Sequence, residues 1–173
     1  MEEVESLVGE AILQIRRLAK GLWPGDLKGD GLMAALQELA LVVTDVFHVG
    51  CVFRYHSPVE FCDSTVIIHL YRIAQEAVNN AIKHGKAKNI TITVVGDEDQ
   101  TTLAVEDDGV GLSAPSAGQE GMGLRIMNYR ARMLGGVCDI RHAPGGGAVV
   151  TCTCPTKGPR NSEGPQGDGE SHD

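Results

Sequence analysis

Basic residues are in the minority in this sequence, and long apolar runs are missing from it. The 173 residues contain 15 Lys and Arg against 23 Asp and Glu, a formal net charge of −8. No basic stripe is present to neutralise phosphates, so a nucleic-acid surface is not expected. Gln37, Glu38 and Asp45 interrupt the longest apolar region, so we expect no membrane contact from this chain.

The N-terminus also lacks the features of a secretory signal. The first ten residues, MEEVESLVGE, are acidic and have no apolar core. Cys-x-x-Cys motifs are absent too, and the five cysteines are an odd number. This usage favours buried free thiols in a reducing compartment over metal ligands. We therefore expect a cytoplasmic chain, within a parent protein that can still be anchored in a membrane elsewhere.

Aromatic residues are few, at 4%, but the chain is 42% hydrophobic, enough for the core of one domain without staples. Apolar periodicity predicts alternating helices and strands. Together they predict a two-layer α/β sandwich of the α+β type, with helices covering one face of a mixed sheet. Helices are expected over residues 31–47, 70–85 (capped at Asp63 or Ser64) and 122–134, and strands over 51–55, 90–95, 102–106, 137–142 and 148–154.

The two ends of the chain differ from this middle part. Residues 4–23 read as a helix with a heptad seam, which needs a partner helix. We interpret residues 1–24 as the C-terminal part of a dimerisation stalk, the alternative being a helix that packs on its own domain. The domain itself is expected over residues 31–155. Residues 156–173 are rich in Gly, Pro, Ser and charge, and are expected to be a disordered tail.

The predicted helix around LYRIAQEAVNNAIKHG carries an unusual polar stripe beside its apolar face. Arg72, Glu76, Asn80 and Lys83 are spaced four, four and three apart. These residue types suit a metal–phosphate ligand, because an amide oxygen binds Mg²⁺, a carboxylate orients water and an ammonium group meets phosphate. A solvated amphipathic helix explains the same stripe equally well.

Two glycine motifs follow. The first motif directly follows the strand LAVE and contains Asp107, Gly109 and Gly111. A carboxylate next to glycine backbone can accept a hydrogen bond from the exocyclic amine of a flat ligand such as adenine. The alternative for this motif alone is an acidic turn. Gly121 and Gly123 open the next helix, where free N–H groups favour phosphate. Between the motifs, residues 112–120 form a short polar segment that could act as a mobile lid.

The order of these three motifs resembles the Bergerat ATP-binding fold, which includes sensor histidine kinases, gyrase-type topoisomerases and chaperone ATPases. The match covers about residues 31–155. RIAQEAVNNAIKHG, VEDDGVGL and GMGLRIMNYRARMLGG are similar to the catalytic domain of sensor histidine kinases of the nitrate-sensor-like subfamily. The resemblance implies binding of ATP with Mg²⁺ and transfer of the γ-phosphate to a stalk histidine.

Carried over position by position, the resemblance also implies residue roles. Asn80 would be the Mg²⁺ ligand, Glu76 a catalytic, water-orienting carboxylate and Lys83 a phosphate contact. Asp107 would accept a hydrogen bond from the adenine amine. The remaining members of the set would let the base approach or shape the phosphate end of the lid: Gly109, Gly111, Gly121, Gly123 and Leu124. Asn79, His84 and Arg125 lie near the motifs and are assigned only loosely.

The sequence departs from the family pattern in three respects. None of its first five histidines is followed by an acidic residue, as a phosphoacceptor usually is, and His172–Asp173 lies in the tail. We expect the acceptor on a stalk helix before Met1, so this chain should bind ATP without labelling itself. Arg125 occupies a position that is glycine in many kinases, and the lid contains no Lys or Arg.

Two other functions fit the same motifs. One is an anti-sigma-type serine kinase, which the heptad seam disfavours because such kinases are freestanding domains. The other is a pseudokinase that only senses nucleotide, which the intact Glu76, Asn80 and Asp107 disfavour. As a sensor kinase, the chain would act with a response regulator and would form a homodimer through its stalk.

Overall fold

A computed structural model describes residues 31–56, 61, 63–111 and 121–158 of the chain. The predicted stalk helix over residues 4–23 therefore lies outside the described residues. The same holds for the predicted lid at 112–120 and for the tail from residue 159 onward.

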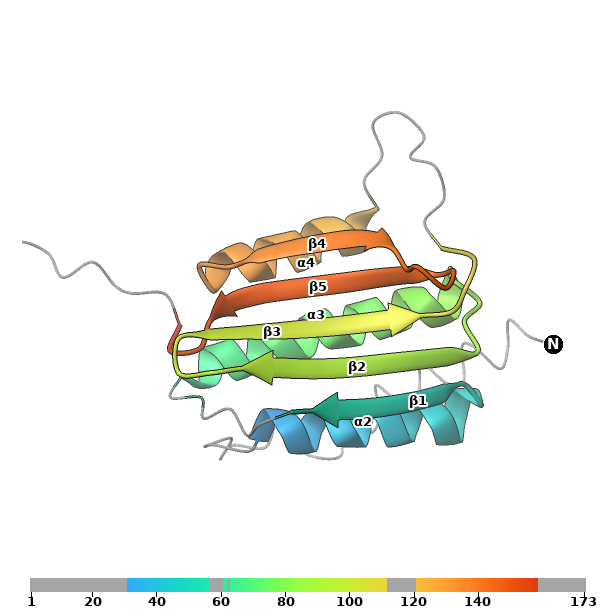
Figure 1. Cartoon of the computed structure of the whole chain (residues 1–173), viewed down its shortest axis with the longest axis horizontal. Helices are drawn as coiled ribbons and strands as arrows, with labels where there is room; N and C mark the ends of the chain where they lie inside the picture. Colours follow the sequence, from blue (N-terminus) through green and yellow to red (C-terminus); the bar gives the residue numbers. More distant parts are fainter. Residues whose placement is uncertain (1–30, 57–60, 62, 112–120, 159–173) are drawn as a thin grey trace, which may run out of the picture.

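The described residues form one five-stranded mixed sheet (Figure 1). Its strands lie in the order β1-β2-β3-β5-β4. β1 pairs with β2 in parallel, and every other neighbouring pair is antiparallel. The strands are β1 (Gly50–Tyr55), β2 (Asn89–Gly96), β3 (Gln100–Asp107), β4 (Val137–His142) and β5 (Ala148–Pro155).

Among the described residues, three helices cover one face of this sheet, and no helix covers the other, which we call the bare face (Figure 1). α2 (Gly31–Phe47) packs on β1, α3 (Ser64–Lys83) crosses the middle of the sheet, and α4 (Met122–Met133) packs on β4. The predicted two-layer α/β sandwich is therefore confirmed, and every element predicted within the described residues is present.

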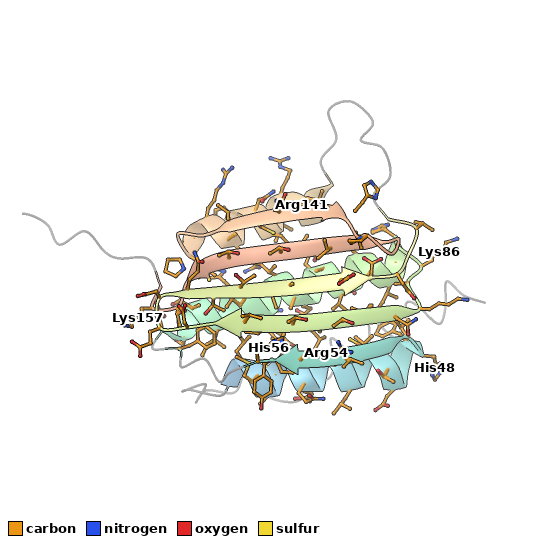
Figure 2. The ribbon with its side chains drawn as sticks, viewed as in Figure 1. His48, Arg54, His56, Lys86, Arg141 and Lys157 are labelled. Carbon is orange, nitrogen blue, oxygen red and sulfur yellow. The ribbon has the colours of Figure 1, made fainter. Side chains whose placement is uncertain are left out.

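The period-two pattern of the strands decides which face the helices cover. Ile92 on β2 pairs with Val105 on β3, and Val105 pairs with Val150 on β5, so buried residues line up across the sheet. The bare face carries Thr and Val together with charged side chains, which include Arg54 of β1, Glu106 of β3 and Arg141 of β4 (Figure 2).

α3 is the helix around which the domain is built. Asp63 caps its N-terminus by accepting a hydrogen bond from Thr65 N–H at 2.7 Å. Leu70, Ile73 and the other apolar residues on one side are buried against the sheet. The helix ends at Lys83 with His84 as its C-cap, two residues before the predicted end at Gly85.

The packed chain extends beyond the boundary expected at residue 155. Thr156 is 1% exposed, although it is polar. Its hydroxyl lies 2.8 Å from the Thr101 hydroxyl and donates to the Asp97 carbonyl at 2.9 Å. Hydrogen bonding makes this burial tolerable, and an apolar pattern cannot reveal it.

The four described cysteines are free thiols, and Cys152 and Cys154 are buried on the same face of β5. Burial raises the pKa of Cys51, Cys138 and Cys154 to about 11, so these thiols stay protonated at neutral pH. Within the described ranges, no helix combines the length and apolar character needed to cross a membrane.

Candidate nucleotide-binding site

A cavity opens between the C-terminal half of α3, the start of α4 and the ends of the central strands. Its walls are mainly apolar, and a few polar groups converge on it, as is typical of small-molecule sites. Two predicted motifs contribute Asp107 and Gly111, and Asn80 and Leu124 come from the helices. The lining residues are Ala77, Asn80, Ala81, His84, Gly85, Asp107, Gly111, Leu124, Met127, Ile140, Ala148 and Val150.

Asp107 is the carboxylate in this cavity, at the end of β3. Its Oδ1 accepts a hydrogen bond from Gly109 N–H at 2.8 Å. Its Oδ2 has no protein donor among the described residues. One oxygen therefore fixes the side chain, and the other remains an acceptor for a ligand N–H group.

Backbone segments meet very closely beside Asp107. Val110 N–H donates to the Gly85 carbonyl at 2.8 Å, and a Cβ at Gly109 would overlap that carbonyl. A Cβ at Gly147, in the β4–β5 turn, would overlap the Asp107 carbonyl. The sequence identified Gly109 but missed Gly85 and Gly147 as site residues, although the Gly-rich turn containing Gly147 was itself a visible signal.

Asp108, the neighbouring carboxylate, has a structural function. It accepts hydrogen bonds from Lys88 N–H and Asn89 N–H at 2.8 Å each, and from Asn89 Nδ2 at 2.7 Å. The Asn89 side chain and then the two backbone N–H groups hold its pKa below the usual value for Asp. It ties the start of β2 to the end of β3 and thereby fixes the position of Asp107.

Asn80 and Glu76 lie one helical turn apart on α3, and the start of α4 packs on both. A Cβ at Gly123 would overlap Glu76 Oε1 and would lie 3.2 Å from Asn80 Nδ2. Gly123 therefore permits close approach of the two helices at this point. Gly121, by contrast, is exposed, and a Cβ there would meet nothing within 4 Å.

The structure divides the polar stripe of α3. Asn80 lines the cavity, whereas Arg72 and Glu76 line a separate groove, together with Asn79. Lys83 is exposed and lines neither, because three residues on a 3.6-residue helix fall short of a full turn. His84 lines the cavity, and Arg125 is exposed and lines neither space.

The donor set is compatible with one divalent cation shared with a ligand. The described part of the chain contains no group of three or more His, Cys, Asp or Glu side chains able to hold a metal. Asn80 offers an amide oxygen in the cavity, and its side chain makes no hydrogen bond to another described residue. Mg²⁺ commonly takes one or two protein ligands and completes its shell with water and phosphate.

Comparisons with known proteins identify the same class of site. The chain matches the family model of the histidine kinase-, DNA gyrase B-, and HSP90-like ATPases over residues 65–158. It is 33% identical over 123 residues to the nitrate/nitrite sensor protein NarX of Escherichia coli (strain K12). That alignment covers 71% of this chain and 21% of NarX. It is 31% identical over 160 residues to the sensor histidine kinase LiaS of Bacillus subtilis, covering 88% and 42%.

Among solved structures, the ATP binding domain of PrrB from Mycobacterium tuberculosis superposes with a TM-score of 0.54 at 21% identity. The alignment covers 73% of this chain and 93% of that one. The fold and the cavity thus define a nucleotide-binding domain of the ATPase type. The chain belongs to the histidine kinase-, DNA gyrase B-, and HSP90-like ATPase family.

This membership confirms the family and fold predicted from the three motifs. It also confirms the domain type, an ATP-binding catalytic domain of the sensor histidine kinase kind. The chain spans less than half the length of the two curated relatives.

Proposed function

We propose that this chain binds Mg·ATP and supplies the γ-phosphate that a sensor histidine kinase transfers to a histidine on its helical stalk. The observation that carries the proposal is Asp107, a carboxylate with one open oxygen in a mainly apolar cavity that Asn80 also lines. An adenine base needs such an acceptor for its amine and apolar walls for its faces.

At the adenine end, Asp107 Oδ2 accepts from the exocyclic amine, and Gly109 and Gly111 keep the backbone bare. At the phosphate end, Asn80 supplies the protein oxygen for Mg²⁺, and Leu124 closes the cavity where Gly121 and Gly123 begin α4. Lys83 is exposed and does not line the cavity, so it would reach the phosphates by extending around α3.

Transfer in this site rests on position and charge. A stalk imidazole nitrogen attacks the γ-phosphorus, the bond from that phosphorus to the β-phosphate oxygen breaks, and the electron pair leaves with ADP. Bound Mg²⁺ supplies neutralisation of the phosphate charge. Glu76 forms no ion pair with another described residue, so its carboxylate can hydrogen-bond to the attacking imidazole or to a water and orient it.

The test is calorimetry of ATP and ADP with and without Mg²⁺, followed by incubation with γ-labelled ATP. We expect Mg²⁺-dependent binding of both nucleotides, no label on this chain, and label on an added stalk fragment of a related kinase. Absence of nucleotide binding would refute the proposal. Label on serine of a partner would indicate a serine kinase, and binding without transfer to any stalk would indicate a nucleotide sensor.

The remaining assignments belong to the whole kinase. We propose that two copies pair through their stalks, that a response regulator takes the phosphoryl group from the stalk histidine, and that this domain works in the cytoplasm, whether or not its parent protein is anchored in a membrane. The similarity to a nitrate/nitrite sensor protein and to a sensor histidine kinase supports a sensor kinase as the parent protein.

A further inference from the structure

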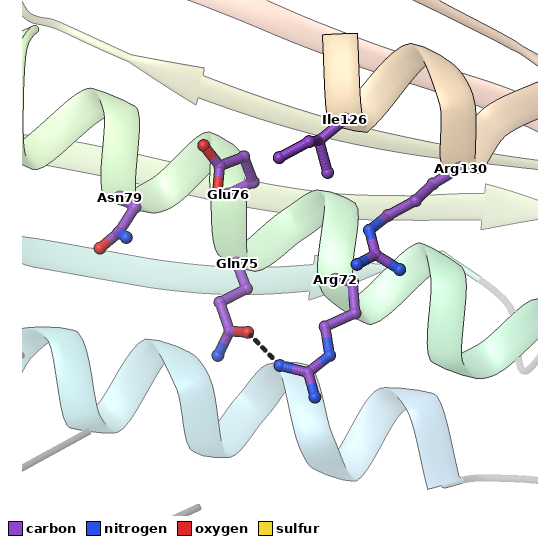
Figure 3. A pocket seen from close by; sticks show the side chains of 6 residues that line it. All are labelled: Arg72, Gln75, Glu76, Asn79, Ile126 and Arg130. Carbon is purple, nitrogen blue, oxygen red and sulfur yellow. Dashed lines mark hydrogen bonds between the residues drawn. The ribbon is translucent and has the colours of Figure 1, made fainter. Parts of the chain in front are cut away.

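A second hollow lies beside the nucleotide cavity, on the outer side of α3 and α4. It has a volume of about 200 Å³, and Figure 3 shows the six side chains around it. In contrast to the cavity, its lining is mainly polar. The lining residues are Arg72, Gln75, Glu76 and Asn79 from α3 and Ile126 and Arg130 from α4; we call this space the outer groove.

The outer groove begins where the nucleotide cavity ends. Asn80 lines the cavity, Glu76 lines the groove one turn earlier, and Arg72 lies one turn earlier still. At 1.5 Å per residue, Arg72 is about 12 Å along α3 from Asn80. A nucleotide held at Asp107 and Asn80 therefore has its transferable end towards Glu76, with the groove lying beyond it.

The two arginines in the groove are held in place by neighbouring side chains. Arg72 Nη1 donates to Gln75 Oε1 at 3.1 Å, and Gln75 is only 9% exposed. Arg130 Nη1 lies 3.4 Å from His69 Nδ1. Burial, and then the charge of Arg130, lower the pKa of His69, so the neutral imidazole can accept from the guanidinium. Among the described residues that line the groove, Glu76 is the carboxylate, and its side chain points away from the two guanidinium groups (Figure 3).

The local charge is opposite to that of the chain as a whole. The sequence has a net charge of −8, but α4 contains Arg125, Arg130 and Arg132 and no acidic residue. The net negative charge of the protein repels an acidic partner, whereas the basic residues of this face attract it. This difference favours an encounter in which the partner approaches the α4 face.

An exposed apolar stripe on α4 borders the groove. Met122, Ile126, Tyr129 and Met133 are 78%, 39%, 63% and 48% exposed, and they are spaced four, three and four residues apart. This is the spacing of a helix that packs against another helix. Ile126 belongs to both the stripe and the groove, so one partner helix can contact both.

We propose that Arg72 and Arg130 form a clamp for a carboxylate on the protein partner that presents the phosphate-accepting histidine. The carboxylate lies on an amphipathic helix whose apolar side rests on the α4 stripe, which places that helix against Glu76. This inference rests on the proposed function and adds to it the docking residues and the chemistry of the partner. An oxyanion of the γ-phosphate has the same chemistry as a carboxylate, and the experiment separates the two sources.

The experiment uses the whole chain and two synthetic helical peptides of about three heptads with an identical Leu seam. One peptide has Glu at the flanking positions and the other has Lys. At about 0.15 M ionic strength, we expect the Glu peptide to bind about tenfold more tightly than the Lys peptide. Backbone amide NMR shifts should report its contact on α3 and α4.

Variants then test the clamp itself. Arg72→Gln combined with Arg130→Gln should lower the affinity for the Glu peptide about tenfold and leave ATP and ADP affinities unchanged. The matched control, Arg54→Gln, removes a positive charge from the bare face of the sheet and should change peptide affinity by less than about twofold. If the double variant does not fold, the two peptides on the unmodified chain decide the question.

Three results would overturn the clamp. These are no binding of the Glu peptide, equal affinity for the Glu and Lys peptides, or a double variant that binds the Glu peptide as tightly as the unmodified chain does. A double variant that loses ATP affinity but keeps ADP affinity would instead place the arginines on the γ-phosphate, and would also overturn it. Failure of the unmodified chain to bind any nucleotide refutes the proposed function separately, because the peptide measurements need no nucleotide.

Discussion

The first glycine motif, residues 107–111, and the second, residues 121–124, line the same cavity but are held in different ways. The first is fastened by Asp108 to the start of β2, by Val110 to Gly85 and by Asp107 to Gly109. The second contributes Gly121, which is open to solvent, and Gly123, which only makes room for Glu76 and Asn80. If the proposed function holds, the hydrogen-bonded first motif would form a preformed base site and the more open second motif an adjustable phosphate site.

The largest effect should come from removing the acceptor in the first motif. Asp107→Asn keeps Oδ1 for Gly109 N–H but places an NH₂ donor where the adenine amine needs an acceptor. We expect ATP affinity to fall by about 100-fold or more, because a buried mismatch of donors leaves groups unpaired. Calorimetry measures the loss, and thermal unfolding should show a stable protein. Unchanged affinity would mean that the base binds elsewhere.

In the second motif, the comparison is between two glycines that are two residues apart. Gly123→Ala forces a Cβ into Glu76 Oε1 and close to Asn80. We expect about tenfold weaker ATP binding, because Asn80, the proposed metal ligand, is displaced. Gly121→Ala has free space and serves as the matched control, with affinity within about twofold of the original. Equal effects of the two changes would contradict the assigned function of Gly123.

Asp108→Asn tests whether the first motif owes its rigidity to hydrogen bonds. Asn can keep some of the bonds from Lys88 and Asn89 but loses the charge that strengthens them. We expect the melting temperature to fall by a few degrees and ATP affinity to fall much less than in Asp107→Asn. If ATP affinity instead falls as much as in Asp107→Asn while the melting temperature hardly changes, Asp108 contacts the ligand directly.

The smallest effect concerns pH. The folded pKa of Asp108 lies below the usual 3.8, so its contribution to stability is present above pH 3.8 and is lost as pH falls through the folded value. The stability difference between the original chain and Asp108→Asn should therefore be constant from pH 7 to about pH 5 and shrink below 3.8. Urea unfolding at a series of pH values measures it, and Asp97, whose pKa is also lowered, is common to both proteins.

The parts of the molecule that the sequence predicts are those determined by local spacing. The apolar period of α3 and the alternation in β2 and β3 determine burial directly, and the interval of four residues places Glu76 and Asn80 on neighbouring turns. Asp108 is structural and Asp107 lines the cavity because Asn89, a residue on another strand, donates hydrogen bonds to Asp108. No local pattern distinguishes these two adjacent acids.

The features that the sequence did not reveal are contacts between distant segments. Gly147 makes room for Asp107 forty positions earlier in the chain, and the outer groove needs Arg72 and Arg130 from two helices. Thr156 is buried because Thr101 and Asp97 satisfy its hydroxyl. Each of these contacts depends on which distant segments the fold brings together. The apolar periodicity of a single helix or strand does not reveal which segments those are.

One wall of the nucleotide cavity belongs to β4, one of the two edge strands of the sheet. Ile140 of β4 lines the cavity, and the turn after β4 carries Gly147 against Asp107. An edge strand is held by a neighbour on one side only, so its backbone amides should take up deuterium earlier than those of β2 and β3. A bound nucleotide needs this wall in place, so occupancy should be readable as slowed exchange in β4, a segment outside all three sequence motifs.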